Sequence, residues 1–281
     1  MKNLVKKLSM AAIALAVISA CSTSPTGRSQ LNLLPASQLD QMGAESWNQI
    51  KSQEPLLTDA QAEAYVQCIT LALAEVVPEQ YYRDSWEVEI FDSETINAFA
   101  LPGGYIGVYV GMIRLAENQH QLAAVMGHEI GHVMAEHGNE RVSQNLLVSG
   151  ALIGTDLAFS SRPPQQRAMI MAAVGVGAQV GYMLPFSRRH ESEADEIGLD
   201  LMAKAGFDPH EAPKLWENMR ELGGGGGPEW LSTHPAPSSR IRDLTNQIPD
   251  VLPDYEARAE RGNLPQCERP AWADERPAEA S

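Results

Sequence analysis

Basic residues are scarce in this chain of 281 residues, which has 21 Lys and Arg against 36 Asp and Glu and a formal net charge of −15. A surface with this excess of negative charge repels phosphate, so the composition excludes nucleic acid as a partner. Aromatic residues are also few, at 6% of the chain, although hydrophobic residues of all kinds make up 44%. We therefore expect a folded core of aliphatic and Met side chains, in one large domain or two small ones. A chain disordered throughout is excluded.

Long apolar runs are lacking as well, and the first apolar run lies near the N-terminus, over residues 10–18. It is far shorter than the about 20 residues that a membrane-spanning helix needs, and three lysines precede it. These features predict that residues 1–20 are a signal peptide. The peptide ends in Ile18-Ser19-Ala20-Cys21, which resembles a bacterial lipobox, in which the cysteine becomes the lipidated first residue of the mature chain. The alternative is an ordinary secretory signal followed by an incidental cysteine.

The resemblance to a lipobox also implies a location. Ser22, rather than Asp, follows Cys21, and in enterobacterial lipoproteins the absence of Asp at this position implies sorting to the outer membrane. We therefore expect an outer-membrane lipoprotein in the periplasm, anchored at Cys21. Residues 21–35 are rich in Ser, Thr and Pro and are expected to form the tether.

Cysteine is rare, with three residues in the whole chain. If Cys21 carries the lipid, Cys68 and Cys267 remain, and a single pair of cysteines in an exported protein suggests a disulfide. This bond would attach the C-terminal tail to an early helix. The alternative is two free buried thiols.

Hydrophobic periodicity and capping residues predict a mostly helical chain with a small sheet. Helices are expected over residues 36–51, 58–77, 118–138, 188–205 and 209–222. Alternation over residues 86–91 predicts a strand, and residues 97–112 predict a hairpin or a pair of edge strands. The glycine run at residues 223–227 predicts a mobile loop.

Residues 142–186 are unusually apolar and are interrupted by Ser161-Arg162-Pro163-Pro164. Residues 168–184 are slightly too few for a membrane span and include Gln179 and three glycines, so we expect a buried or interfacial helical hairpin. Beyond Asp250 the chain is rich in Pro and charge, which predicts an irregular tail over residues 251–281. The main domain is therefore expected to span residues 36–250.

His128-Glu129-Ile130-Gly131-His132 lies within the helix expected over residues 118–138. A spacing of four places the two imidazoles on one helix face, with Cβ atoms about 5–6 Å apart, so that both can bind one metal ion. Glu129 can reach the water that a bound zinc activates without binding the metal itself, which is the position of a general base. The alternative is two exposed histidines on a surface helix.

A catalytic zinc takes three protein ligands and keeps one open position. The third histidine of a metzincin is absent, because Gly138 stands ten residues after His128. His137 is one residue out of register, and we interpret it as a structural or surface residue. The third ligand is therefore expected on another segment.

Residues 188–195 offer two glutamates on a second helix. Glu191 lies on a stripe of small and apolar residues suited to close helix packing, whereas Glu193 shares its stripe with Asp200 and Lys204, which indicates a solvated face. Glu191 is therefore the preferred third ligand. Asp195, one turn after Glu191, can accept the free N–H of a ligating imidazole and fix its tautomer.

Four motifs, in this order, resemble those of one family. NAFALPGG at residues 97–104, HEIGH at 128–132, ESEAD at 191–195 and STHP at 232–235, which Arg240-Ile241 follows, are similar to the HtpX-like and CaaX-prenyl-protease-like zinc metallopeptidases. The resemblance covers about residues 26–250 and, with the lipobox, is closest to the small periplasmic lipoprotein members.

The resemblance implies an α+β, mostly helical zincin fold of the gluzincin type, with a small β-sheet. It implies one Zn²⁺ per chain held by His128, His132 and Glu191, with Glu129 as the general base. In resembling periplasmic proteins the histidine that corresponds to His234 lies near the zinc and can occupy the open position in an auto-inhibited state.

His234 has two other interpretations. It could donate a hydrogen bond to the oxyanion of the tetrahedral intermediate, or it could be an ordinary loop histidine. Arg240 could pair with an active-site carboxylate or with the oxyanion. The glycine run that precedes His234 makes its loop a candidate gate.

The segment Asn97, Ala98, Phe99 and Ala100 is expected to form an open edge strand beside the site. Zincin-type proteases bind an extended peptide along such a strand through backbone hydrogen bonds, which do not depend on side-chain identity. The alternative is an ordinary core hairpin.

Together these observations predict a lipid-anchored zinc metalloendopeptidase. The resemblance implies quality control in the envelope, with unfolded or misassembled envelope polypeptides as substrates and the outer-membrane assembly machinery as a possible partner. One alternative is a metal-bound chaperone or assembly factor whose proteolysis is minor or auto-inhibited through His234. A second alternative is a zinc hydrolase of a non-peptide substrate.

Overall fold

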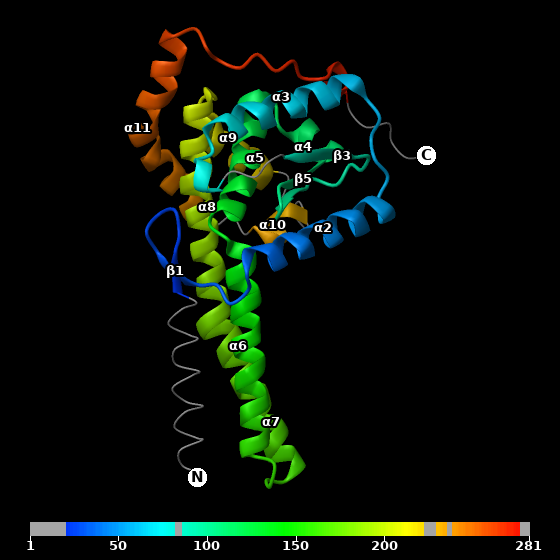
Figure 1. Cartoon of the computed structure of the whole chain (residues 1–281), viewed down its shortest axis with the longest axis vertical. Coiled ribbons are helices and arrows are strands. Elements are labelled where there is room, and N and C mark those ends of the chain that lie inside the picture. Colours follow the sequence, from blue (N-terminus) through cyan, green and yellow to red (C-terminus); the bar gives the residue numbers. More distant parts are fainter. Residues whose placement is uncertain (1–20, 82–85, 222–228, 235–237, 276–281) are drawn as a thin grey trace. The chain divides into compact units, whose positions relative to one another are not determined.

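The computed structural model describes residues 21–81, 86–221, 229–234 and 238–275, and the chain divides into two compact units (Figure 1). Unit 1 takes in the described residues up to Leu39 together with Ala135–His190, and unit 2 takes in Asp40–Met134 and the described residues from Glu191 onwards. The expected signal peptide and the glycine run at residues 223–227 lie outside the described residues.

The sheet of unit 2 has three strands, β3 (Glu87–Phe91), β4 (Ala98–Leu101) and β5 (Tyr105–Tyr109), in the order β3-β5-β4. β3 runs parallel to β5, whereas β4 and β5 form an antiparallel hairpin. The turn of this hairpin needs glycine, because Gly103 and Gly104 have φ angles of 92° and 90°. The predicted strand and hairpin are confirmed, and β4 is an edge strand of this sheet.

Helices make up most of unit 2. They are α2 (Ala36–Gln53) and α8 (Leu184–Ala205), both of which begin in unit 1, and α3 (Ala60–Val76), α4 (Val110–Leu115), α5 (Gln119–Met134), α9 (Glu211–Glu221), α10 (Glu229–Thr233) and α11 (Ser238–Glu260), with short 3₁₀ turns η1 (Glu79–Tyr81) and η3 (Ala271–Asp274). The expected mostly helical α+β class is confirmed.

α5 is a deeply buried helix of unit 2, since every residue from Gln121 to Met134 is buried. It packs against β4, α3 and α9 (Figure 1). The side-chain oxygen of Asn118 accepts hydrogen bonds from the first free backbone N–H groups, as an N-cap residue does. The helix ends at Met134 rather than at Gly138 as expected, because Glu136 adopts a left-handed conformation with φ 50° and a new helix begins at His137.

Five aromatic residues cluster beside the sheet. Trp47, Phe91 and Tyr109 form a buried cluster with the half-buried Phe99 and Tyr105. The rings of Phe91 and Tyr109 stack with their centroids 5.1 Å apart. The expectation of a purely aliphatic and Met core therefore does not hold for this part of unit 2.

The C-terminal segment differs from the expected irregular tail, because α11 continues through residues 251–260. Pro249 and Pro253 both lie inside α11. They are four residues apart, so the missing backbone donors fall on one helix face. Further on, Cys267 forms the predicted disulfide with Cys68 of α3, with 5.7 Å between the Cα atoms.

Unit 1 begins with a two-stranded antiparallel sheet of β1 (Cys21–Thr23) and β2 (Ser29–Leu31). Arg28 pairs with Glu140 at 2.7 Å, the Asn32 amide donates to Glu136 at 2.6 Å, and the Leu33 backbone N–H donates to the Ser143 hydroxyl at 2.9 Å. The segment that we expected to be a tether is thus folded against the beginning of the helix α6 (His137–Ala158).

The apolar segment of unit 1 forms the predicted helical hairpin, with α6 (His137–Ala158) and α7 (Pro164–Ala178) side by side (Figure 1). The short π-helix η2 (Gln179–Met183) connects α7 to α8. The buried residues of α6 all lie at or before Gln144, and α7 and η2 have none. A buried hairpin is therefore not what unit 1 contains.

Candidate metal centre

The first two candidate ligands lie on the buried helix α5. His128 and His132 are 3% and 8% exposed, and one helical turn brings their Nε2 atoms to 3.0 Å from each other. Two imidazole nitrogens this close need a proton or a cation between them, because their lone pairs otherwise repel.

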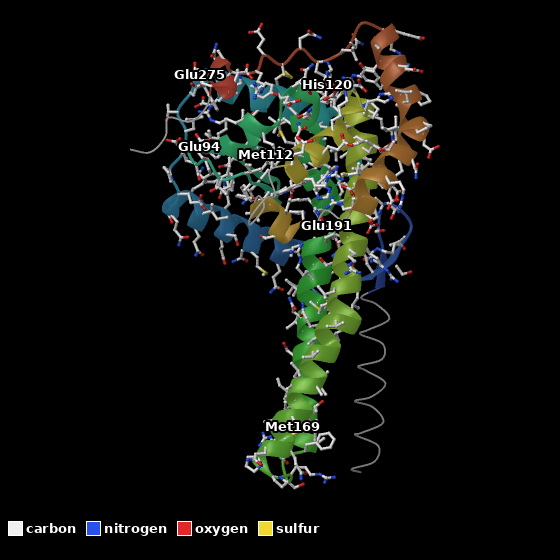
Figure 2. All side chains as sticks on the ribbon, turned by 180° about the vertical axis from the view of Figure 1, so that it is seen from behind. Glu94, Met112, His120, Met169, Glu191 and Glu275 are labelled. Atoms are coloured by element: carbon white, nitrogen blue, oxygen red, sulfur yellow. A yellow bond between two sulfur atoms is a disulfide. The ribbon has the colours of Figure 1, made fainter. Side chains whose placement is uncertain are left out.

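Glycines let a second helix approach α5 closely enough to complete the cluster. A Cβ atom added at Gly198 of α8 would lie 2.7 Å from the backbone nitrogen of His128, and one added at Gly127 would lie 2.9 Å from the Gly198 carbonyl oxygen. This contact places Glu191 of α8, marked in Figure 2, against the two histidines. Its Oε2 lies 3.4 Å from His128 Nε2, and its Oε1 lies 3.5 Å from His132 Nε2.

A third imidazole enters from the residue that follows α10. His234 Nδ1 lies 3.2 Å from His128 Nε2 and 3.1 Å from Glu191 Oε2. One ligand atom from each of His128, His132, Glu191 and His234 lies within 4.8 Å of the others. The structure thus brings together the three expected ligands and His234.

The donor set fits zinc. Zn–N and Zn–O bonds of about 2.0–2.1 Å in a tetrahedron place neighbouring ligand atoms about 3.3–3.4 Å apart. The separations between the ligand atoms of His128, His132, Glu191 and His234 described above are 3.0–3.5 Å. Three imidazoles and one carboxylate are also ligands that zinc prefers.

Asp195 fixes the orientation of one ligand, as the sequence suggested. The Nδ1–H of His128 donates to Asp195 Oδ1 at 3.0 Å, which leaves Nε2 facing the cluster. Burial alone would raise the pKa of Asp195, but Arg240 lowers it below its usual range by two hydrogen bonds of 2.7 Å. Arg240 also donates to Glu191 at 3.1 Å, so it pairs with both carboxylates.

The carboxylates around His128 favour its protonated form. Burial disfavours the charged imidazole, but the hydrogen bonds to Asp195 and Glu191 outweigh burial and raise the pKa of His128 to about 9. The same negative charge that binds this proton would bind a cation, so protons and metal compete for this site.

Glu129 lies beside the cluster but points its carboxylate at other groups. It is 3% exposed, and its Oε1 accepts a hydrogen bond from the Trp230 indole N–H at 2.8 Å and lies 3.6 Å from His234 Nε2. The carboxylate is thus next to the ligand atoms without being one of the four, as the sequence predicts for a general base.

Trp230 and Trp216 are site residues that the sequence interpretation missed. The Trp230 ring stacks on Trp216 with centroids 4.6 Å apart and on His234 at 4.9 Å, and the Arg240 guanidinium lies 3.9 Å from the Trp216 ring centroid. Four flat groups therefore form one stack that joins Arg240 to His234. The spacing of four between Trp230 and His234, which puts both on one helix face, is the signal that could have revealed the contact.

The short helix α10 also contacts the start of the edge strand. The Trp230 backbone N–H donates to the Ile96 carbonyl at 3.2 Å, two residues before β4. β4 itself, which contains Ala98, Phe99 and Ala100, packs against α5. The expected edge strand is therefore next to the helix that carries the histidines, and α10 lies at its beginning.

Two other expectations need comment. His137 is fully buried in unit 1 and stacks on His190 at 4.2 Å, which is a structural position. Glu193 is 5% exposed, so the expectation of a solvated face is wrong. The stripe of Glu193 also contains Ile197 and Leu201, both buried, and these apolar residues decide its environment more than Asp200 and Lys204 do.

Comparisons with known proteins point in one direction. The profile described as Peptidase family M48 matches residues 60–248. The mitochondrial metalloendopeptidase OMA1 of Danio rerio is 35% identical over 189 residues, which cover 65% of this chain and 39% of that protein. The β-barrel assembly-enhancing protease of Escherichia coli K12 is 30% identical over 259 residues, or 89% of this chain and 52% of that protein. The chain thus spans about half the length of these relatives, or less.

Proposed function

This chain belongs to peptidase family M48, and on that basis we propose that it is a zinc-dependent metalloendopeptidase in which His128, His132 and Glu191 hold the metal. The observation that carries the proposal is the convergence of these ligand atoms, 3.0–3.5 Å apart, beside the buried carboxylate of Glu129. A bound zinc supplies a Lewis acid that polarises the scissile carbonyl and lowers the pKa of water toward about 7.

The residues of the chain divide the remaining work. Glu129 takes the proton of the attacking water and passes it to the leaving amine. Asp195 and Arg240 keep His128 and Glu191 in orientation through hydrogen bonds of 2.7–3.1 Å. β4 binds the substrate as an additional strand, which suits polypeptides that are unfolded and can become extended.

His234 blocks the site in the resting enzyme. Its Nδ1 is within 3.2 Å of two ligand atoms. The indole N–H of Trp230, in the same short segment, donates a hydrogen bond to the Glu129 carboxylate. Substrate cleavage then requires that α10 moves away and releases both the fourth position and the base.

The experiment is a cleavage assay on an unfolded polypeptide such as reduced casein. Removal of metal by a chelator should abolish cleavage, and one equivalent of zinc should restore it. His234→Ala should cleave faster than the wild type, because the fourth position is then free. A slower His234→Ala variant would contradict the blocking role and favour a role as oxyanion donor.

A second candidate function is a chaperone or assembly factor with little proteolysis. It is favoured by the contacts of Glu129 with Trp230 and of His234 with the ligand atoms, since both keep the base and the fourth position occupied. If zinc binds stoichiometrically and neither the wild type nor His234→Ala cuts a peptide bond, this second function replaces the first.

For location, we propose a lipoprotein of the outer membrane that faces the periplasm and is anchored at Cys21, with unfolded or misassembled envelope polypeptides as substrates. Support comes from the lipobox sequence and from the name of the β-barrel assembly-enhancing protease, a relative over 89% of the chain. Radioactive palmitate should label the wild type but not Cys21→Ser.

A further inference from the structure

The helical hairpin of unit 1 exposes a large apolar surface. Among the described residues, twelve large apolar side chains are exposed, and eight of them lie on α6, α7, η2 or the first residue of α8: Leu146, Leu147, Ile153, Leu157, Met169, Val176, Val180 and Leu184. Met169, which is 73% exposed, lies close to the turn of the hairpin (Figure 2). Exposed apolar surface of this extent marks a site of interaction.

Charge is nearly absent from the same segment. Between Val142 and Ser187 the only charged residues are Asp156, Arg162 and Arg167, although the whole chain has 36 acidic residues in 281. All three lie at or near the turn, and Asp156 and Arg167 form an ion pair with each other. Away from the turn, the two helices of the hairpin thus have no charged side chain that an apolar solvent would have to accommodate.

We propose that this hairpin inserts into the hydrocarbon layer of a lipid bilayer. The continuous helical stretch Pro164–Ala205 is long and apolar enough to cross a membrane, and none of its most apolar window is buried. Residues 168–184 are about 25 Å long as a helix, close to the about 30 Å of a bilayer core. The polar turn with Arg162 and Arg167 therefore reaches the headgroups on the far side, where arginine side chains are tolerated.

An inserted arrangement fits better than a helix lying flat on the surface. From Ala168 to Ala178, α7 has no polar side chain on any face, whereas an interfacial helix needs one polar face. The exposed positions of α7 also extend over more than half of its circumference. A docked protein would cover only one side, but lipid surrounds the hairpin completely.

Residues at the base of the hairpin match the headgroup region. Arg141 precedes the apolar part of α6, Arg188 and Arg189 follow that of α8, and all three are exposed. Tyr182 lies close to this end, half-buried. Basic and aromatic residues flank membrane-inserted helices in this way, because they interact with anionic headgroups and the interface.

The start of unit 1 offers an independent observation. The residues that flank β2 are held against α6 by the contacts of Arg28 with Glu140 and of Leu33 with Ser143, three residues before the exposed apolar residues of the helix begin at Leu146. Cys21 is the first residue of β1 and pairs with Leu31 of β2. A lipid on Cys21, which belongs to the proposed function above, would thus enter the same membrane surface as the hairpin.

Depth-dependent fluorescence tests insertion on the full lipid-anchored chain. With Cys21 lipidated, as the proposed function has it, and Cys68 and Cys267 in a disulfide, Ile153→Cys and Val176→Cys each provide a single thiol for an environment-sensitive NBD dye. Met42→Cys, an exposed apolar residue of α2 in unit 2, is the matched control. In vesicles of phosphatidylethanolamine and phosphatidylglycerol we expect a blue shift and loss of most fluorescence to brominated lipids at positions 153 and 176, and neither at position 42.

Three results would overturn insertion. Vesicle-bound protein whose dyes at 153 and 176 report water would exclude it, as would a blue shift without vesicles that grows with protein concentration, which would indicate a second copy. Quenching at 153 that persists in a Val176→Asp/Val180→Asp chain would show that the apolar stem is not what inserts. Dye incorporation into the wild type would mean that Cys21 carries no lipid. Casein cleavage is measured in parallel, so that a failure of membrane insertion can be distinguished from a failure of the proposed peptidase function.

Discussion

Asp195 accepts hydrogen bonds from His128 and from two nitrogens of Arg240. A single buried carboxylate therefore orients a ligand of the metal and pairs with the guanidinium of Arg240. Because both partners are donors, the site needs an acceptor-only group at this position. The same residue has no contact of its own with the other ligand atoms among the described interactions, so its effect on the metal is indirect.

Asp195→Asn should therefore weaken zinc binding by about 10–100-fold, because the amide NH₂ cannot accept from His128 and leaves Arg240 partly unpaired. A competition titration with a zinc-sensitive dye measures this. The control is Asp200→Asn on the same helix, which removes only an exposed pair with Lys204. Equal zinc affinity in both variants would contradict the role of Asp195.

A second buried carboxylate, Glu140 of unit 1, lies between Arg28 and His190 at 2.7 and 2.9 Å. Burial by itself would raise its pKa, but the hydrogen bonds from His190 and Arg28 lower the pKa from 4.5 to about 2. A lowered carboxylate pKa stabilises the fold above the unfolded value of 4.5, and this contribution is lost as the pH falls from 4.5 toward 2.

We predict that Glu140→Gln lowers the free energy of unfolding by roughly 2–3 kcal/mol at pH 7. The variant should also lose the part of the pH dependence of stability between pH 4.5 and 2 that arises from the titration of Glu140. Urea unfolding followed at pH 7 and at pH 3 gives both quantities. The matched change Glu75→Gln, in an exposed pair with Arg258, should have little effect. A Glu140→Gln chain with the wild-type pH dependence would rule out this explanation.

At the scale of elements, β4 is the edge strand beside α5, and its register shows which of its groups face outward. The Tyr109 backbone N–H donates to the Asn97 carbonyl, so these two residues form a hydrogen-bonded pair of the antiparallel ladder. Such pairs recur every two residues along the strands, and Phe99 with Gly107 is the next one. Ala98 and Ala100 therefore direct their backbone N–H and C=O groups away from β5. Ala98 is buried, whereas Ala100 is half-exposed, so the proposed pairing of a substrate with β4 would use the backbone groups of Ala100.

Ala100→Pro should keep the β4–β5 ladder but remove one donor to the substrate, so we expect KM for an unfolded polypeptide to rise by about tenfold with an unchanged fold. Steady-state cleavage and circular dichroism measure the two effects. Ala100→Val retains the N–H group and serves as the control. A KM unchanged by proline would mean that the substrate does not pair with β4.

Features of the fold and site that depend on residues close together in the chain could be predicted from the sequence, and those that depend on contacts between distant segments could not. The pair His128 and His132 and the stripe of Glu191 depend on helix periodicity, which a sequence displays directly. The hydrogen bond from Trp230 to Glu129, the left-handed Glu136 and the burial of Glu193 depend on packing between segments far apart in the chain. The Pro-rich and charged composition beyond Asp250 also misled, because α11 continues through Pro249 and Pro253 to Glu260.

At the scale of the molecule, the chain combines a helical unit with an apolar hairpin and a unit with a buried cluster of ligands. The disulfide between Cys68 and Cys267 lies in unit 2 and is of the kind found in exported proteins. The formal net charge of −15 disfavours nucleic acid as a partner, because the acidic surface repels phosphate groups.

The role of Glu129 as general base of a zinc peptidase is tested by comparing the wild type with Glu129→Gln for zinc content and for cleavage of an unfolded polypeptide. We expect one zinc per chain in both proteins and cleavage slower by about 10²–10⁴-fold in Glu129→Gln, because only the base is lost. Glu191→Ala should lose the zinc, and Glu193→Ala should keep it. Equal cleavage by Glu129→Gln and the wild type, at equal zinc content, would show that Glu129 is not the general base.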